Sequence, residues 1–184
     1  PIPMLLRLFA IINASILFSI LPKCDFAKGK EKLKNTTESQ YYIVVSKSDN
    51  TLTVYDSEDW VVRYPCTFGS NDLEDKMMQG DRRTPEGNFH IASKYYHNKW
   101  DRFMLLDYPT KADYEKFNQR KALRLIPKAA KIGGSIGIHG TWPKEEWAVE
   151  DLQPWTQGCI SMKNEDVEEL YEMISPGTLV IIKK

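Results

Sequence analysis

The stretch "GGSIGIHGT" (residues 133–141) decides how the rest of the sequence is interpreted. This stretch predicts a short strand that ends at His139 and that the chain enters through glycines, which allow many backbone conformations. Twenty residues after that histidine, "WTQGCISM" (155–162) places Cys159 in a tight turn directly after a glycine. If the two stretches meet in the fold, Cys159 is a candidate nucleophile with a base beside it. If they do not meet, it is a buried core thiol.

A pairing of Cys159 with His139 has a definite chemical meaning. A free thiol has a pKa of about 8.5, so little of it is thiolate near pH 7, and a nucleophilic cysteine needs a proton acceptor within reach. His139 is such an acceptor, and the carbonyl of Gly140 or of a neighbour is free to orient its ring. We expect Gly158 to turn N–H groups toward the oxygen that becomes negative during acyl transfer, each donor being worth about 3 to 4 kcal/mol.

Outward from this pair, strand-forming residues dominate. "YYIVVSK" and "TLTVYDS" flank a turn at 48–50 and predict a hairpin, whereas residues 111–123 are charged at helical spacing. Asn164 can cap a helix whose apolar residues fall on one face, namely Val167, Leu170, Tyr171 and Ile174. Further strands are expected within 60–69, 87–95, 102–109, 133–141 and 178–184. The predicted class is mainly β, a β-rich α+β domain that is mostly antiparallel and has one or two helices.

Length and charge narrow the classes of protein. The chain has 184 residues, which fits one domain and an appendage, and its 25 basic and 25 acidic residues cancel. Neither a nucleic-acid partner nor a polyacidic tail is indicated. The three cysteines are Cys24, Cys66 and Cys159, an odd number without metal-ligand spacing, so neither a disulfide framework nor a metal site is predicted. Cys66 lies in an apolar strand and is expected to be a core thiol.

The N-terminus is the one strongly biased segment. Residues 1–22 contain a nearly continuous apolar run from Leu8 to Leu21, which favours an export signal or a membrane anchor. Residues 23–40 are polar and rich in lysine and predict a linker before the domain at 41–184. Cys24 lies where a lipid-modified cysteine would lie, although a lysine precedes it. We therefore expect export to the periplasm or cell envelope, with the N-terminal segment contacting the membrane.

Three motifs in order identify a family. "GDRRTPEGNFHI" (80–91) is followed by the His-Gly-Thr and Gly-Cys-Ile motifs, and together they resemble the L,D-transpeptidase catalytic domain family over residues 41–184. "LLDYPTKAD" (105–113) and Thr-x-Gly-Cys in place of Ser-His-Gly-Cys resemble one branch of it. The resemblance implies a β-sandwich with one or two helices. It also implies an enzyme that acts on the peptide stems of peptidoglycan.

The same resemblance implies the roles of the residues. Cys159 would attack the carbonyl of the bond between a diamino acid and the terminal D-alanine to give a thioester. His139 would take the thiol proton and protonate the leaving amine. An amine would then resolve the thioester into a cross-link or an attached envelope protein, or water would trim the stem. No metal or organic cofactor is implied.

Two departures from the family motif concern the substrate. The common second histidine is Gln157 here, whose amide cannot act as a base near pH 7, and a position that often holds arginine or asparagine is Ser161. The candidate substrate-binding residues are therefore Gln157 and Ser161, together with Thr141, Trp142 and Trp155. The tryptophans of this loop form either a wall over the thiol or a cover for the core.

Several alternatives stay open at this level. An L,D-carboxypeptidase or another hydrolase would use the same site, and a catalytically silent wall-binding module would keep only the fold. Arg82 and Arg83 either belong to a charged surface loop or bind a carboxylate of the substrate. His90 and His97 are expected to be structural or surface residues.

Overall fold

The computed structural model describes residues 40–184. The expectations for the segment 1–22 and the linker up to residue 39, including lipid attachment at Cys24, lie outside the described residues. No helix in the described part is long and apolar enough to cross a bilayer.

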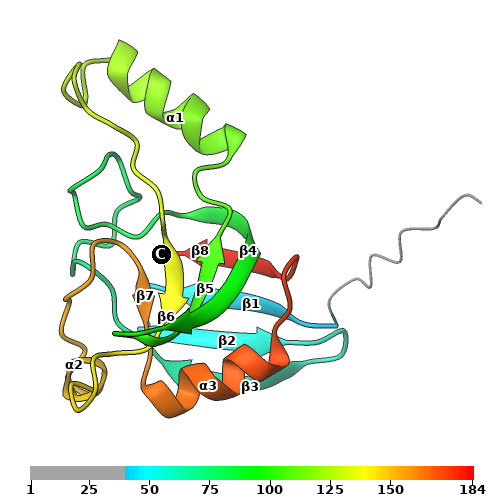
Figure 1. Cartoon of the computed structure of the whole chain (residues 1–184). Coiled ribbons are helices and arrows are strands. Elements are labelled where there is room, and N and C mark those ends of the chain that lie inside the picture. Colours follow the sequence, from blue (N-terminus) through cyan, green and yellow to red (C-terminus); the bar gives the residue numbers. More distant parts are fainter. Residues whose placement is uncertain (1–39) are drawn as a thin grey trace, which may run out of the picture. The chain divides into compact units, whose positions relative to one another are not determined.

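Eight strands form one sheet in the order β3-β2-β1-β8-β4-β5-β6-β7 (Figure 1). Five neighbouring pairs are antiparallel, and the two parallel pairs are β1 with β8 and β6 with β7. The bounds are β1 Tyr42–Ser46, β2 Thr51–Tyr55, β3 Trp60–Pro65, β4 Gly87–His97, β5 Asp101–Leu106, β6 Gly137–His139, β7 Ile160–Ser161 and β8 Leu179–Lys183.

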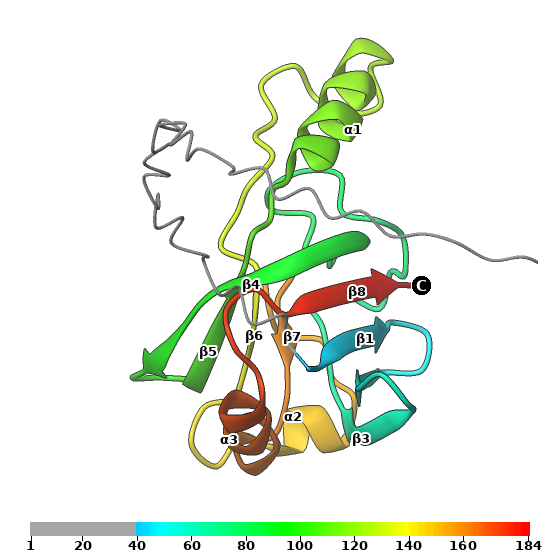
Figure 2. The ribbon, with the colours of Figure 1, turned by 90° about the vertical axis from the view of Figure 1, so that its right-hand side faces the viewer.

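The long strand β4 joins two halves of the sheet. Its first part, to His90, pairs with β8, whereas its second part, from Ile91, pairs with β5, and the register shifts between Ile91 and Ser93. A bulge of this kind bends and twists a strand, and β4 curves across the sheet in Figure 2. One core cluster includes side chains from both halves, for example Val45 and Ile138.

Three helices accompany the sheet: α1 Lys111–Ala122, α2 Trp147–Glu150 and α3 Asn164–Met173. Thr110 and Asp113 form a capping box at the start of α1. The predicted apolar face of α3 is confirmed, because Val167, Leu170, Tyr171 and Ile174 are buried. This face packs on β5 and β6.

The predicted cap of α3 is wrong. Lys163 is the N-cap residue and Asn164 is the first residue of the helix. The Asn164 side chain accepts a hydrogen bond from the backbone N–H of Thr141 at 2.8 Å instead of capping its own helix. The carboxamide therefore bonds Thr141, which is distant in the sequence, and this contact lies two residues from His139.

The predicted fold class is confirmed, since the chain is mostly β sheet with few helices. Every expected strand and both expected helices are present, and the short elements α2 and β7 are additional. Cys66 is fully buried, and burial raises its pKa, as a core thiol requires.

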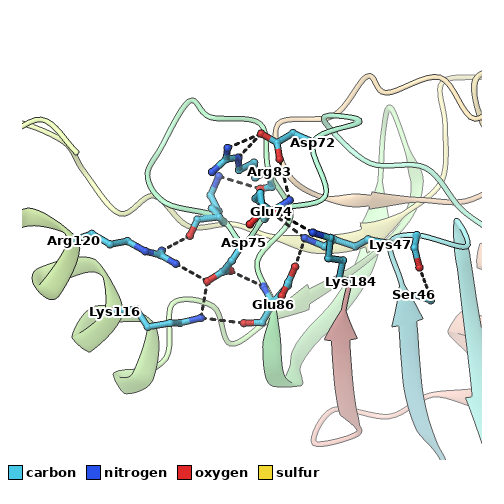
Figure 3. Close-up of polar contacts among 12 residues, drawn as sticks. Ser46, Lys47, Asp72, Glu74, Asp75, Arg83, Glu86, Lys116, Arg120 and Lys184 are labelled. Carbon is cyan, nitrogen blue, oxygen red and sulfur yellow. Dashed lines mark hydrogen bonds and ion pairs between the residues drawn. The ribbon is translucent and has the colours of Figure 1, made fainter. Parts of the chain in front are cut away.

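A polar network ties α1 to the loop over residues 70–86 (Figure 3). Asp75 accepts hydrogen bonds from Arg120 at 2.7 Å, from Lys116 at 3.0 Å and from the backbone N–H of Glu86 at 2.8 Å. Burial acts to raise the pKa of Asp75, but these three donors hold it below its usual value. Lys47 pairs with the Glu86 carboxylate at 2.6 Å and extends the network to the end of β1.

We predict that Asp75→Asn lowers the free energy of unfolding by about 1 to 3 kcal/mol, because two cations and one amide lose a charged acceptor. Glu74→Gln is the matched control. Its side chain pairs with Lys184 where both groups are largely exposed, so no measurable change is expected. Urea denaturation at pH 7 measures both, and equal effects of the two variants would show that the network does not hold the loop.

Candidate active site

The His-Gly-Thr and Gly-Cys-Ile motifs meet because β6 and β7 run side by side in the same direction. The register pairs Ile138 with Ile160 and His139 with Ser161, and Cys159 directly precedes β7. The thiol and the imidazole both line one cavity of about 360 Å³. The arrangement that the sequence left open is therefore present.

The imidazole of His139 is fixed on three sides. The ring is buried, and its Nδ1 lies 2.7 Å from the carbonyl oxygen of Gly140. Because a carbonyl only accepts, Nδ1 carries the proton and Nε2 keeps its lone pair. One ring face stacks on Trp100, with centroids 4.7 Å apart, and Phe103 stacks at 5.4 Å. The histidine is thus held as a neutral base in one tautomer.

The carbonyl that orients the histidine is itself held in place. The backbone N–H of Gly140 donates to Trp100 O at 3.0 Å, and its carbonyl also accepts from Ser161 Oγ at 3.3 Å. A Cβ at this position would lie 2.2 Å from Asn164 Oδ1, which already accepts a hydrogen bond from Thr141 N. Only glycine fits here, which explains the Gly after the histidine.

Cys159, the candidate nucleophile, lies on a turn that Thr156 organises. Thr156 Oγ1 accepts from the backbone N–H of Gly158 at 3.2 Å and donates to the carbonyl of Cys159 at 2.8 Å. Gly158 has φ of +122°, and a Cβ there would lie 2.7 Å from Arg83 O. The Gly158 amide, which we expected to face an oxyanion, is thus engaged inside the turn.

Burial keeps both reacting groups neutral. It lowers the pKa of His139 to about 4 and raises the pKa of Cys159 to about 11. The thiol donates to Ser135 O at 3.5 Å. The cavity therefore disfavours the charged form of both groups in the free protein.

The candidate substrate-binding residues are divided between two cavities. Trp155 and Gln157 line the cavity that contains the thiol. Thr141 and Trp142 line a neighbouring one of about 370 Å³, and Trp155 forms a wall of both. Ser161 is fully buried, lines neither cavity, and its hydroxyl supports the Gly140 carbonyl.

The two arginines before the Thr-Pro motif have protein partners. Arg82 donates to the carbonyls of Pro154 and Thr156, each at 3.3 Å, and so holds the segment that leads to Cys159. Arg83 pairs with Asp72 at 2.5 Å. Within residues 40–184, no three His, Cys, Asp or Glu side chains gather as metal ligands would.

Sequence reasoning predicted strands at β4 and β5 but did not place their hairpin at the site. Tyr95, His97, Trp100 and Phe103 from this hairpin line the thiol cavity. His97, which we expected to be structural or superficial, stacks on Trp100 with centroids 4.4 Å apart and accepts from Lys99 N at 3.2 Å. The aromatic spacing of residues 95–103 was the available signal, but alternation alone does not say which site a hairpin borders.

Comparison with known families decides the identity of the domain. A family model described as the L,D-transpeptidase catalytic domain matches residues 40–182. The chain belongs to this family. A Bacillus subtilis (strain 168) protein described as "Putative L,D-transpeptidase YqjB" is 29% identical over 154 residues, which cover 81% of this chain and 74% of that protein.

Solved structures share the fold of this family member. Bd1075 from Bdellovibrio bacteriovorus has a TM-score of 0.58 at 19% identity and covers 81% of this chain. The helical cell shape determining protein Pgp2 from Campylobacter jejuni has a TM-score of 0.55 at 20% identity and covers 83%. The chain spans only 49% and 54% of these two proteins.

We predict that stability falls as the pH drops from 6.5 to 4. The unfolded chain binds a proton at histidine near pH 6.5, whereas folded His139 resists it until about pH 4. The neutral histidine therefore contributes stability that is complete above the unfolded pKa and is lost on acidification, by about 3 kcal/mol across this window. His139→Phe retains a stacked ring and cannot titrate. Denaturation at pH 7.5 and 4.5 should show a clearly smaller pH effect in the variant, and an unchanged effect would contradict the prediction.

Proposed function

We propose that this protein is a cysteine-dependent L,D-transpeptidase that acts on peptidoglycan stem peptides through a thioester acyl-enzyme. The observation that carries the proposal is the shared cavity of Cys159 and a histidine whose Nδ1 proton is bound to Gly140 O. Family membership supports the reaction class, and the apolar, aromatic cavity suits a peptide chain.

In the first half-reaction, the sulfur of Cys159 bonds to the carbonyl carbon that joins the diamino acid to the terminal D-alanine. As this bond forms, the thiol proton passes to Nε2 of His139, so that no free thiolate needs to accumulate in the buried cavity. The tetrahedral oxyanion then collapses, the C–N bond breaks, and the same proton goes to the leaving amine of D-alanine. The products are a thioester and free D-alanine.

The surroundings of the ring stabilise the cation that exists between these two transfers. An imidazolium would keep its Nδ1–H bond to Gly140 O, and its charge would lie against the faces of Trp100 and Phe103. The backbone N–H of Cys159 is the donor that we assign to the oxyanion. Pre-organised groups of this kind cost no reorganisation when the charge appears.

In the second half-reaction, an amine or water attacks the thioester while Nε2 accepts its proton. The sulfur leaves as the thiol, and the product is a cross-linked stem, an attached envelope protein or a trimmed stem. We place this activity in the cell envelope, with residues 1–22 as signal or anchor, because the apolar run of that segment is typical of export.

We predict that Cys159→Ala abolishes turnover of disaccharide-tetrapeptide and retains the thermal unfolding midpoint of the wild type within a few degrees, since a partly exposed thiol is replaced by a smaller side chain. Mass spectrometry of the products measures the reaction. Thr67→Ser is a matched control on the neighbouring strand segment, where only a methyl group is lost.

The same assay separates the possible outcomes. Dimers identify a transferase, tripeptide alone identifies an L,D-carboxypeptidase, and no product from the wild type would favour a silent wall-binding module. Wild-type rates in Cys159→Ala would eliminate the proposed mechanism.

We also predict that a carbapenem acylates Cys159. The β-lactam carbonyl is a strained acyl donor, so attack by the thiol opens the ring and adds the whole drug mass to the protein. Intact-mass spectrometry should show one adduct in the wild type and none in Cys159→Ala, whereas the buried Cys66 should stay unmodified. An adduct that persists in Cys159→Ala would show that another group reacts.

A further inference from the structure

A second, polar cavity adjoins the thiol cavity. It has a volume of about 230 Å³, and three of its lining residues, Gly134, Ile136 and Gln157, also line the cavity of Cys159. The larger cavity is walled by aromatic rings, whereas the smaller one is lined by Lys76 and by glycines. A ligand with an apolar part and a charged end could therefore occupy both.

Lys76 is an unusual lining residue because it is 5% exposed. Its ammonium group donates to Asp81 Oδ1 at 2.7 Å and to Arg83 O at 3.3 Å. An ammonium has three N–H donors, and no acceptor for the third lies among the described residues. A buried donor without a partner is costly, which favours a ligand atom as that partner.

Lys76 forms a buried ion pair with Asp81, but it is not the only donor to that carboxylate. The Asp81 carboxylate also accepts from the backbone N–H groups of Met77, Met78 and Arg83, at 2.7, 3.0 and 3.0 Å. These amides share the stabilisation of its negative charge. Burial is the main influence on the pKa of Cys159 and raises it, but the charge of Lys76 acts in the opposite direction, so its field reaches the thiol.

We propose that the small cavity is a carboxylate subsite in which Lys76 donates its third N–H to a carboxylate of the substrate, within one residue of the bond that is cleaved. This inference rests on the proposed function, since it names how the same site recognises a stem peptide. Two sources have the same chemistry: the carboxylate of the leaving D-alanine, and a side-chain carboxylate of the diamino acid. A single buried cation with an acidic neighbour suits a monoanionic carboxylate better than a dianionic phosphate.

Binding to the full-length Cys159→Ala variant tests the subsite without turnover. Calorimetry would compare the stem tetrapeptide with two analogues, one amidated at the D-alanine carboxylate and one amidated at the diamino-acid carboxylate. We expect one amidation to weaken binding at least tenfold and thereby to identify the source. Equal affinity for all three peptides, or no binding of any, would overturn the subsite.

Substitution of the lysine provides the second arm. In the same background, Lys76→Met should raise the Kd of the free acid to that of the sensitive amide and leave the Kd of the amide unchanged. Lys128→Met removes an exposed charge and should change neither. A loss of affinity that is equal for acid and amide would mean that Lys76 only supports the fold.

Two further measurements keep the outcomes separate. Lys76→Met leaves the Asp81 carboxylate buried without its cation, so the double variant Lys76→Met/Asp81→Asn removes both charges together. Thermal melting checks that each variant is folded. If the wild type releases no product from the tetrapeptide but the acid still binds more tightly than its amide, the proposed reaction fails and the subsite stands.

Discussion

The hydrogen bond from His139 Nδ1 to the carbonyl of Gly140 is the interaction on which the site depends. It selects the tautomer, and the tautomer decides which nitrogen can take a proton. The residue that supplies the acceptor is held at both of its polar groups, because the Gly140 N–H donates to Trp100 O and the Gly140 carbonyl also accepts from Ser161 Oγ. The fold thus uses the backbone for a task that a carboxylate performs in other catalytic triads.

Thiol sites are of two kinds, and burial of His139 and Cys159 bears on which kind this one is. An open, electropositive site stores a thiolate, whereas a closed apolar one keeps the thiol protonated and relies on a base at the moment of attack. The pKa of about 4 for His139 and that of about 11 for Cys159 agree with the second kind of site, in which both groups are neutral when no ligand is bound.

The sequence was sufficient for features that local pattern determines. Helical spacing placed Val167, Leu170, Tyr171 and Ile174 on one face, and all four are buried. The order of the motifs was enough to pair Cys159 with His139. Features set by contacts between distant segments were not predicted: Asn164 was expected to cap a helix but bonds Thr141, and His97, expected to be a structural or surface residue, borders the cavity. Only the packed fold determines which residues become neighbours.

The parallel pairing of β6 and β7 has a consequence for how the two motifs are spaced. Strands that run in the same direction cannot be joined by a tight turn, so the chain has to travel back along the edge of the sheet before it re-enters. The connection between Gly140 and Thr156, which contains α2 and three tryptophans, is that return path. Because the register of β6 and β7, and not the length of this connection, keeps His139 beside Ser161, the connection can change in length without displacing the two motifs from each other.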